Sequence, residues 1–173
     1  MRRYHLAITV IGFSLAVPAV GIAADPLRPD ASPAAVIEAM NAAVTARDLP
    51  SVKRHFAPGG VQFSLRPAHT GLGGAASGLT TPLEAHWSMI GPVLFGATKS
   101  YERQIEVLDA RVEGEVATIW TRTRTRTVRG TPPVTKQDEF VEIYLLVRTG
   151  GEWKIGAIAD NRRPNDIGLG AKP

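Results

Sequence analysis

One histidine stands where it could move protons. His86 lies three residues after Leu83 and four before Ile90, so on a helix it borders their apolar stripe and can face a pocket. Imidazole titrates close to neutrality, which suits the proton transfers of an isomerase or a dehydratase. In that hypothesis Tyr101 or Arg122 stabilises the developing oxyanion. We favour the alternative that His86 only flanks the stripe and bonds to backbone, because the sequence identifies no partner carboxylate.

A second candidate is the regular alternation of threonine and arginine over residues 121–127. In a strand it places the arginines on one face and the threonines on the other. The arginine face is Arg122, Arg124 and Arg126 with Trp120. A row of guanidinium groups could hold a carboxylate, phosphate or sulfated ligand through paired hydrogen bonds. The alternative, which we favour, is a solvated outer face whose arginines pair with glutamates on neighbouring strands.

A carboxylate at Asp160 ends the last strand that the pattern predicts. Counting by twos places Asp160 opposite the face of Trp153 and puts two alanines on the tryptophan face. If that face is the inner one, small apolar side chains stand where an enzyme could carry an acid or a base, which weakens a catalytic hypothesis. We expect Asp160 to pair with Arg162 or Arg163 at the surface instead.

Several other kinds of site lack support in the sequence. After the first 24 residues the histidines are His55, His69 and His86, which show no paired metal-binding spacing, and the chain has no cysteine. No Gly-Lys-Ser/Thr follows the glycine-rich residues 66–80, so they do not form a phosphate-binding P-loop. Residues 74–78 (GAASG) carry their serine at the wrong position for a GxSxG nucleophile elbow. We therefore predict no metal site and no cofactor.

The first 24 residues have the order of a secretory signal peptide. Arg2 and Arg3 precede an uncharged run over residues 6–24 that ends in small residues. A cut after Ala23 or Ala24 lowers the count of Lys and Arg from 20 to 18, against 16 Asp and Glu, and this weak charge argues against nucleic-acid binding. The alternative is a retained membrane anchor. We favour cleavage, which predicts a periplasmic or secreted protein without stable membrane insertion.

The rest of the chain predicts one α+β domain over residues 32–164, between a flexible lead at 25–31 and a flexible tail at 165–173. Helical spacing predicts a helix at 33–47, a shorter one that starts after Asp48 and includes Phe56, and a third that Thr81 caps. A short strand at 61–65 follows the second helix. Long alternating runs predict strands at 101–112, 115–128, 137–148 and 152–160, and their glycine turns favour antiparallel pairing.

Three passages carry a resemblance to a known superfamily. They are residues 52–61 (VKRHFAPGGV), 113–118 (EGEVAT) and 150–155 (GGEWKI), in this order. Over nearly all of its length after the signal, the chain resembles the nuclear transport factor 2-like superfamily and its SnoaL-like members. The resemblance implies a cone-shaped fold, with helices packed on a curved antiparallel sheet around a pocket. Because this superfamily includes isomerases, dehydratases, cyclases and binding modules, the fold does not choose a function.

We expect an exported, noncatalytic SnoaL-like domain that holds a small, partly apolar ligand in its cone, or that forms a homodimer through its sheet. The ligand-binding residues that we expect are Trp87, Trp120, Phe140 and Tyr144, with Tyr101 as a further lining aromatic. The alternative is a cofactor-independent isomerase, dehydratase or cyclase in which His86 is the base.

Overall fold

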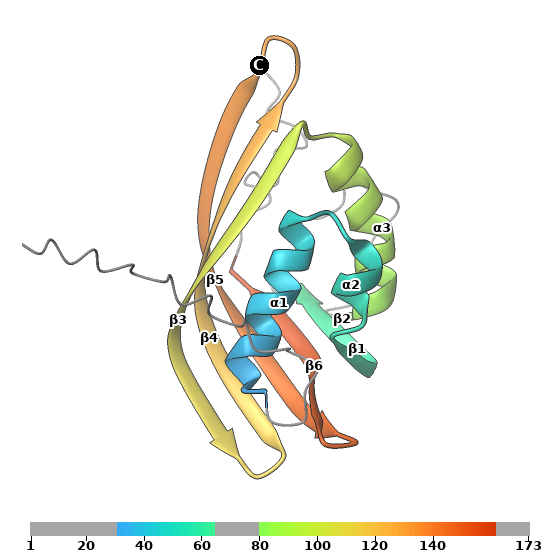
Figure 1. Ribbon diagram of the computed structural model, residues 1–173, viewed down its shortest axis with the longest axis vertical. Helices are drawn as coiled ribbons and strands as arrows, with labels where there is room; N and C mark the ends of the chain where they lie inside the picture. The colour runs from blue at the N-terminus through green and yellow to red at the C-terminus, as the bar shows by residue number, and fades with distance from the viewer. Residues whose placement is uncertain (1–30, 65–79, 162–173) are drawn as a thin grey trace, which may run out of the picture.

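The computed structural model describes residues 31–64 and 80–161, which form a six-stranded sheet with three helices on one side (Figure 1). The strand order across the sheet is β2-β1-β6-β5-β4-β3. We call the face that the helices cover the inner face, and the opposite one the outer face. The elements are α1 (Pro33–Thr45), α2 (Leu49–Lys53), β1 (Phe56–Ser64), β2 (Thr80–Pro82), α3 (Leu83–Gly96), β3 (Ser100–Glu113), β4 (Val116–Arg129), β5 (Val134–Thr149) and β6 (Glu152–Asp160).

Helix α1 forms where the sequence predicts it, for local reasons. The hydroxyl of Ser32 accepts a hydrogen bond from the Ala35 amide at 3.2 Å, and Pro33 follows the cap with its backbone already suited to a helix. Residues at helical spacing then bury one side of α1 against the inner face of the sheet. The buried apolar residues include Val36, Ile37, Met40, Ala43 and Val44.

The chain leaves the second helix earlier than expected. Helix α2 ends at Lys53, and Phe56, which we expected on its buried face, is the first residue of β1. The reason is pairing with the last strand: the Ile155 amide donates to the His55 carbonyl at 2.8 Å, and Phe56 lies opposite Ile155. This β1–β6 pair is parallel, an exception in an otherwise antiparallel sheet.

The start of the third helix also differs from the prediction. Thr81 does not cap α3, because it lies in the short strand β2 opposite Gln62 of β1. Pro82 occupies the cap position and supplies no side-chain hydrogen bond. Strand pairing has therefore replaced the capping box that the Thr-Pro-Leu-Glu sequence predicted.

The four long strands form the antiparallel meander that the alternating runs predicted. β3 to β6 pair in chain order, and the ribbon shows them bending around α1. Gly114 and Gly150 turn two of the connections with positive φ angles of 58° and 61°. The α+β, cone-shaped fold class is thus confirmed.

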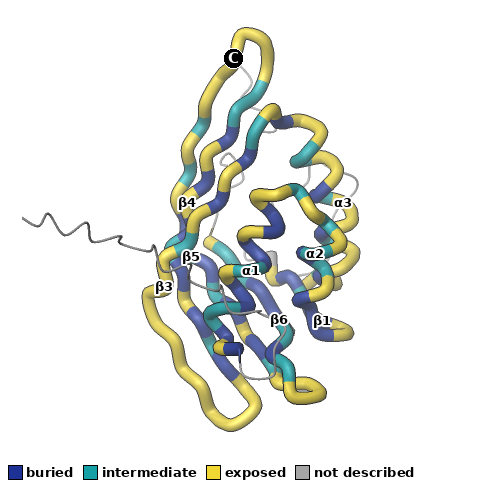
Figure 2. Tube along the Cα trace, viewed as in Figure 1, coloured by how far each residue is buried: buried dark blue, intermediate teal, exposed yellow. Residues whose placement is uncertain are grey.

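Burial alternates along these strands, and the buried positions face the helices (Figure 2). The lower half of the inner face is apolar and packs on α1. Its strand residues include Ala117, Ile119, Tyr144, Leu146, Trp153 and Ile155. In the part of the chain that the structure describes, no helix is long and apolar enough to cross a membrane, and no three potential metal-ligating side chains are grouped.

Candidate functional site

Above the apolar half, the inner face of β4 carries hydroxyl groups. Thr121, Thr123, Thr125 and Thr127 are all buried, while the arginines between them point outward. The alternation predicted from the sequence is confirmed. A buried row of hydroxyls needs polar partners, since an unpaired polar group out of water costs free energy.

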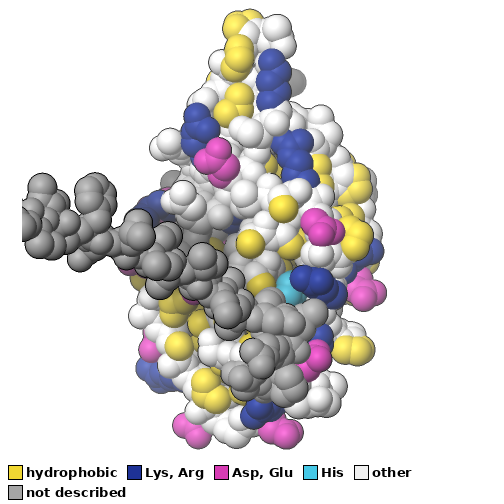
Figure 3. All heavy atoms as spheres, in the orientation of Figure 1, with side chains coloured by type: hydrophobic (Ala, Val, Ile, Leu, Met, Phe, Trp, Pro, Cys, Tyr) yellow, Lys and Arg dark blue, Asp and Glu magenta, His cyan; other side chains and the backbone are white. Residues whose placement is uncertain are grey.

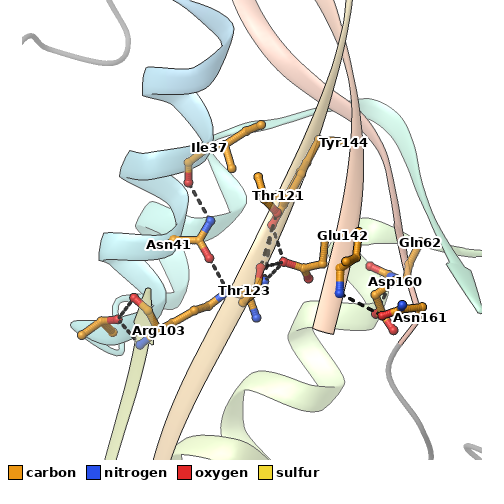
Figure 4. Close-up of polar contacts among 12 residues, drawn as sticks. Ile37, Asn41, Gln62, Arg103, Thr121, Thr123, Glu142, Tyr144, Asp160 and Asn161 are labelled. Atoms are coloured by element: carbon orange, nitrogen blue, oxygen red, sulfur yellow. Dashed lines mark hydrogen bonds and ion pairs between the residues drawn. The ribbon is translucent and has the colours of Figure 1, made fainter. Parts of the chain in front are cut away.

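Five side chains next to this row form what we call the buried polar cluster: Arg103, Glu142, Tyr144, Thr123 and Asn41 (Figure 4). Three donors converge on Oε2 of Glu142. They are Nη2 of Arg103, the Thr123 hydroxyl at 2.6 Å and the Tyr144 hydroxyl at 2.9 Å. Nε of Arg103 donates to Oδ1 of Asn41, which is held on α1. The cluster thus joins α1 to three strands.

The electrostatics of the buried polar cluster favour a fixed ion pair. Burial by itself lowers the pKa of Arg103, but the Glu142 carboxylate beside it raises that pKa well above its usual value. Burial, followed by the charge of Glu142, raises the pKa of the Tyr144 phenol. Tyr144 therefore remains a neutral donor, and the carboxylate that three donors hold is suited to organising the core rather than to carrying protons.

Asp160 lies on the inner face, and our prediction that it faces away from Trp153 is wrong. The register between β5 and β6 shifts next to Gly156, so Trp153, Ile155 and Ile158 all join the core. After this bulge Asp160 lies directly opposite Glu142. Nε2 of Gln62 on β1 lies 3.5 Å from Oδ2 of Asp160 (Figure 4). Arg162 and Arg163, its expected partners, are outside the described residues.

Among the predicted ligand-binding residues, Phe140 and Tyr144 lie on the inner face. Tyr144 belongs to the buried polar cluster, and the Arg103 guanidinium lies 5.6 Å from the centre of the Phe140 ring. Tyr101 is also buried on this face, at the start of β3. All three aromatic side chains therefore lie on the face of the sheet that the helices cover.

His86 and Trp87 are neighbours on α3. The half-buried His86 ring meets the Trp87 ring edge-on, with centroids 6.4 Å apart. Trp87 is packed in the core, and its indole N–H has no hydrogen-bond partner in the described chain. No described contact joins His86 to Tyr101.

Two predicted site residues lie on the outer face, where they cannot contact a ligand in the cone. Trp120 is 43% exposed there. Nη1 of Arg122 lies 3.0 Å from Glu106, and its Nε lies 3.5 Å from Glu139. A strand sends alternate side chains to opposite faces, so Arg122 and the buried Tyr101 cannot act on one oxyanion.

The arginine row makes the ion pairs that we expected of a solvated face. Arg124 pairs with Glu139 at 2.7 Å, and Arg126 pairs with Glu102 at 3.4 Å. The face visible in Figure 3 likewise shows Lys and Arg interspersed with Asp and Glu, without a continuous basic patch. The guanidinium groups of the row are therefore already neutralised by carboxylates on β3 and β5.

Sequence reasoning missed Arg103 and Glu142. A signal for both was present: Glu142 stands between Phe140 and Tyr144 at a period of two, and Arg103 follows Tyr101 at the same spacing. A charged residue that stands two positions from an inward-facing aromatic residue in a strand must itself point inward. Two opposite charges of this kind on one sheet predict a buried pair.

Comparison with known proteins identifies the fold. Neither family models nor curated proteins match the sequence. A ketosteroid isomerase-like protein from Erwinia carotovora atroseptica matches with a TM-score of 0.58 and 15% identity, over 73% of this chain and 90% of that chain. A nuclear transport factor 2-like superfamily protein from Salmonella enterica matches with a TM-score of 0.58 and 13% identity, over 80% and 92%.

A third similar structure is a domain of unknown function with a cystatin-like fold from Nostoc punctiforme. Its TM-score is 0.56 at 14% identity, and the match covers 75% of this chain and 74% of that one. At such identities the likeness concerns the fold. The chain has the nuclear transport factor 2-like, cystatin-like fold that its sequence predicted.

Proposed function

We propose that this chain is a noncatalytic binding domain that holds a small, partly apolar molecule against its inner face. The observation that carries the proposal is the composition of that face. Buried threonine hydroxyls and the buried polar cluster adjoin an apolar core within one continuous surface. Such a mixture of apolar walls and a few fixed polar groups is typical of ligand sites.

The same geometry gives less support to proton-transfer catalysis. Glu142 is an acid buried on the inner face, and three donors hold its Oε2. A catalytic acid or base must reach a proton of the substrate, whereas Oε2 of Glu142 already accepts hydrogen bonds from three side chains of the protein. The candidates His86, Tyr101 and Arg122 are spread over a helix and two faces of the sheet.

Tryptophan fluorescence tests the proposal. The chain has three tryptophans, and replacing the exposed Trp120 with phenylalanine leaves Trp87 and Trp153, both buried in the core, as reporters. We expect at least one of progesterone, decanoic acid and 2-acetylnaphthalene to change the emission of this variant saturably. If none of the three changes the emission up to its solubility limit, the proposal is wrong.

A second candidate function is self-association through the outer face. Apolar side chains are exposed there on adjacent strands: Val116, Trp120 and Leu145 are 44%, 43% and 38% exposed. Exposed apolar area of this kind favours a protein contact. Sedimentation equilibrium of the wild type and of Trp120→Ser tests it, since a homodimer built on this face should dissociate in the variant. A monomeric wild type at 100 µM would remove this candidate.

A further inference from the structure

The buried guanidinium of Arg103 has one nitrogen to which no described residue offers a hydrogen-bond acceptor. Nε donates to Asn41, and Nη2 donates to Glu142 and, at 3.3 Å, to the Tyr144 hydroxyl. No acceptor in residues 31–64 or 80–161 contacts Nη1, although Arg103 is only 8% exposed. A guanidinium has five N–H donors, and Nη1 carries two of them. Nη1 is not one of the fully buried, unpartnered nitrogen and oxygen atoms of the described residues, so it is accessible to an acceptor from outside the protein.

Three hydroxyl groups beside Arg103 share this property. Thr125 lies directly opposite Arg103 on β4, and Thr127 lies opposite Tyr101. All three residues are buried on the inner face. No hydrogen bond joins their hydroxyls to another described residue, and like Nη1 these oxygens are not fully enclosed. We call Nη1 of Arg103 and the hydroxyls of Tyr101, Thr125 and Thr127 the donor patch. Side chains directly opposite in an antiparallel pair start about 4.5–5.5 Å apart at Cβ, so these residues occupy one region of the inner face.

The charges around the donor patch select a neutral acceptor rather than an anion. The positive charge of Arg103 is already balanced by Glu142, with which it makes a buried ion pair. The carboxyl group of Asp160 lies opposite Glu142 on the next strand. A second negative charge brought next to Glu142 would be repelled in a site where water screens little. A ketone, ester or amide oxygen accepts the same hydrogen bonds without this cost.

Apolar side chains adjoin the donor patch and suit the rest of such a ligand. The Phe140 ring lies under the Arg103 guanidinium, and Ile105 follows Arg103 on the inner face of β3. Ile105 is only partly buried, as are Leu94 and Phe95 at the end of α3. A carbonyl group on an apolar body would therefore find complementary surface at both ends.

We propose that the donor patch is the polar anchor of the ligand site, and that it binds a neutral carbonyl oxygen on an apolar, ring-sized molecule. This inference rests on the proposed function and deepens it by naming the ligand chemistry. Binding would give Nη1 and the hydroxyls an acceptor that residues 31–64 and 80–161 do not provide.

Three probes of one shape test the anchor: 2-acetylnaphthalene carries the carbonyl, 2-ethylnaphthalene lacks it, and 2-naphthoate replaces it with a carboxylate. Their dissociation constants are measured by fluorescence or ligand-observed NMR on the mature domain and on Tyr101→Phe/Thr125→Val. The control is Thr118→Val, which makes the same change on the outer face of β4. Urea unfolding verifies that each variant folds, and Thr125→Val alone serves if the double variant does not.

We compare the affinity for 2-acetylnaphthalene with that for 2-ethylnaphthalene as a ratio. The anchor predicts that this ratio falls about tenfold or more in the double variant, because a site built to hydrogen-bond a ligand group loses about this much when the bonds are removed. With Thr125→Val alone, we expect a fall of about threefold or more. The ratio should not change in Thr118→Val, and 2-naphthoate should bind more weakly than 2-acetylnaphthalene. An unchanged ratio in the variant used overturns the anchor and leaves the proposed function standing, and preferential binding of the naphthoate overturns the neutral-acceptor class. Failure of all three naphthalene probes to bind overturns the anchor, whereas the proposed function is overturned only if progesterone and decanoic acid also fail to bind.

Discussion

Replacing Glu142 with glutamine removes the negative charge on which Arg103, Thr123 and Tyr144 converge. Glutamine has nearly the same shape, so the change leaves the packing in place and isolates the charge. Arg103 would then remain as an uncompensated cation with its side chain only 3% exposed. Breaking a buried pair in this way costs about 3–5 kcal/mol. We therefore expect Glu142→Gln to lower the free energy of unfolding by about 3 kcal/mol or more.

Urea denaturation followed by far-UV circular dichroism measures this loss. The matched control is Glu139→Gln, on the outer face of the same strand, whose partner Arg124 lies 2.7 Å away in solvent. Exposed pairs contribute little, so this variant should unfold almost as the wild type does. The double variant Arg103→Met/Glu142→Leu should lose less stability than Glu142→Gln, because no buried charge remains. A loss below about 1 kcal/mol in Glu142→Gln would refute the buried ion pair.

Three further predictions concern other parts of the chain. Burial, followed by the charges of Arg54 and Lys154, lowers the pKa of His55 from 6.5 to about 4, so between these pH values only the unfolded chain binds this proton. The free energy of unfolding should fall as the pH drops through this window, by at most about 3 kcal/mol. The variant His55→Leu should lack this contribution to the pH dependence. Gly60→Ala should destabilise by about 1–3 kcal/mol, because its Cβ would lie 3.0 Å from the Ile155 carbonyl, whereas Gly96→Ala, with nothing within 4 Å, should not. Amino-terminal sequencing of the protein exported by a bacterial host should start at residue 24 or 25, and a retained first methionine would contradict the signal peptide.

Much of the fold could be predicted because strand and helix periodicities dominate this sequence. The Thr/Arg alternation of β4 specifies which face is inward, and Ser32 with Pro33 specifies where α1 starts. The departures arise from pairing between distant segments. Phe56 leaves the helix because β6 offers it a partner, and Thr81 leaves the cap because β1 does. Local propensity cannot anticipate a partner that lies far along the chain.

The site was harder to predict because it depends on one bulge and one ion pair. The register shift beside Gly156 reverses the face of every later residue in β6, so a correct count by twos gave the wrong side for Asp160. Trp120 was misplaced for a different reason. Its aromatic type suggested a lining role, although its alternation with Ile119 already placed it among the arginines.

Isoleucine methyl NMR tests the central claim, that the ligand lies on the inner face, most directly. Ile105 of β3 lies opposite the buried Thr123 and faces inward. Ile143 of β5 lies opposite the exposed Trp120 and faces outward. With 2-acetylnaphthalene added to the purified protein, we predict that the δ1-methyl signal of Ile105 shifts saturably and that of Ile143 does not. A saturable shift of Ile143 with Ile105 unchanged would contradict the account.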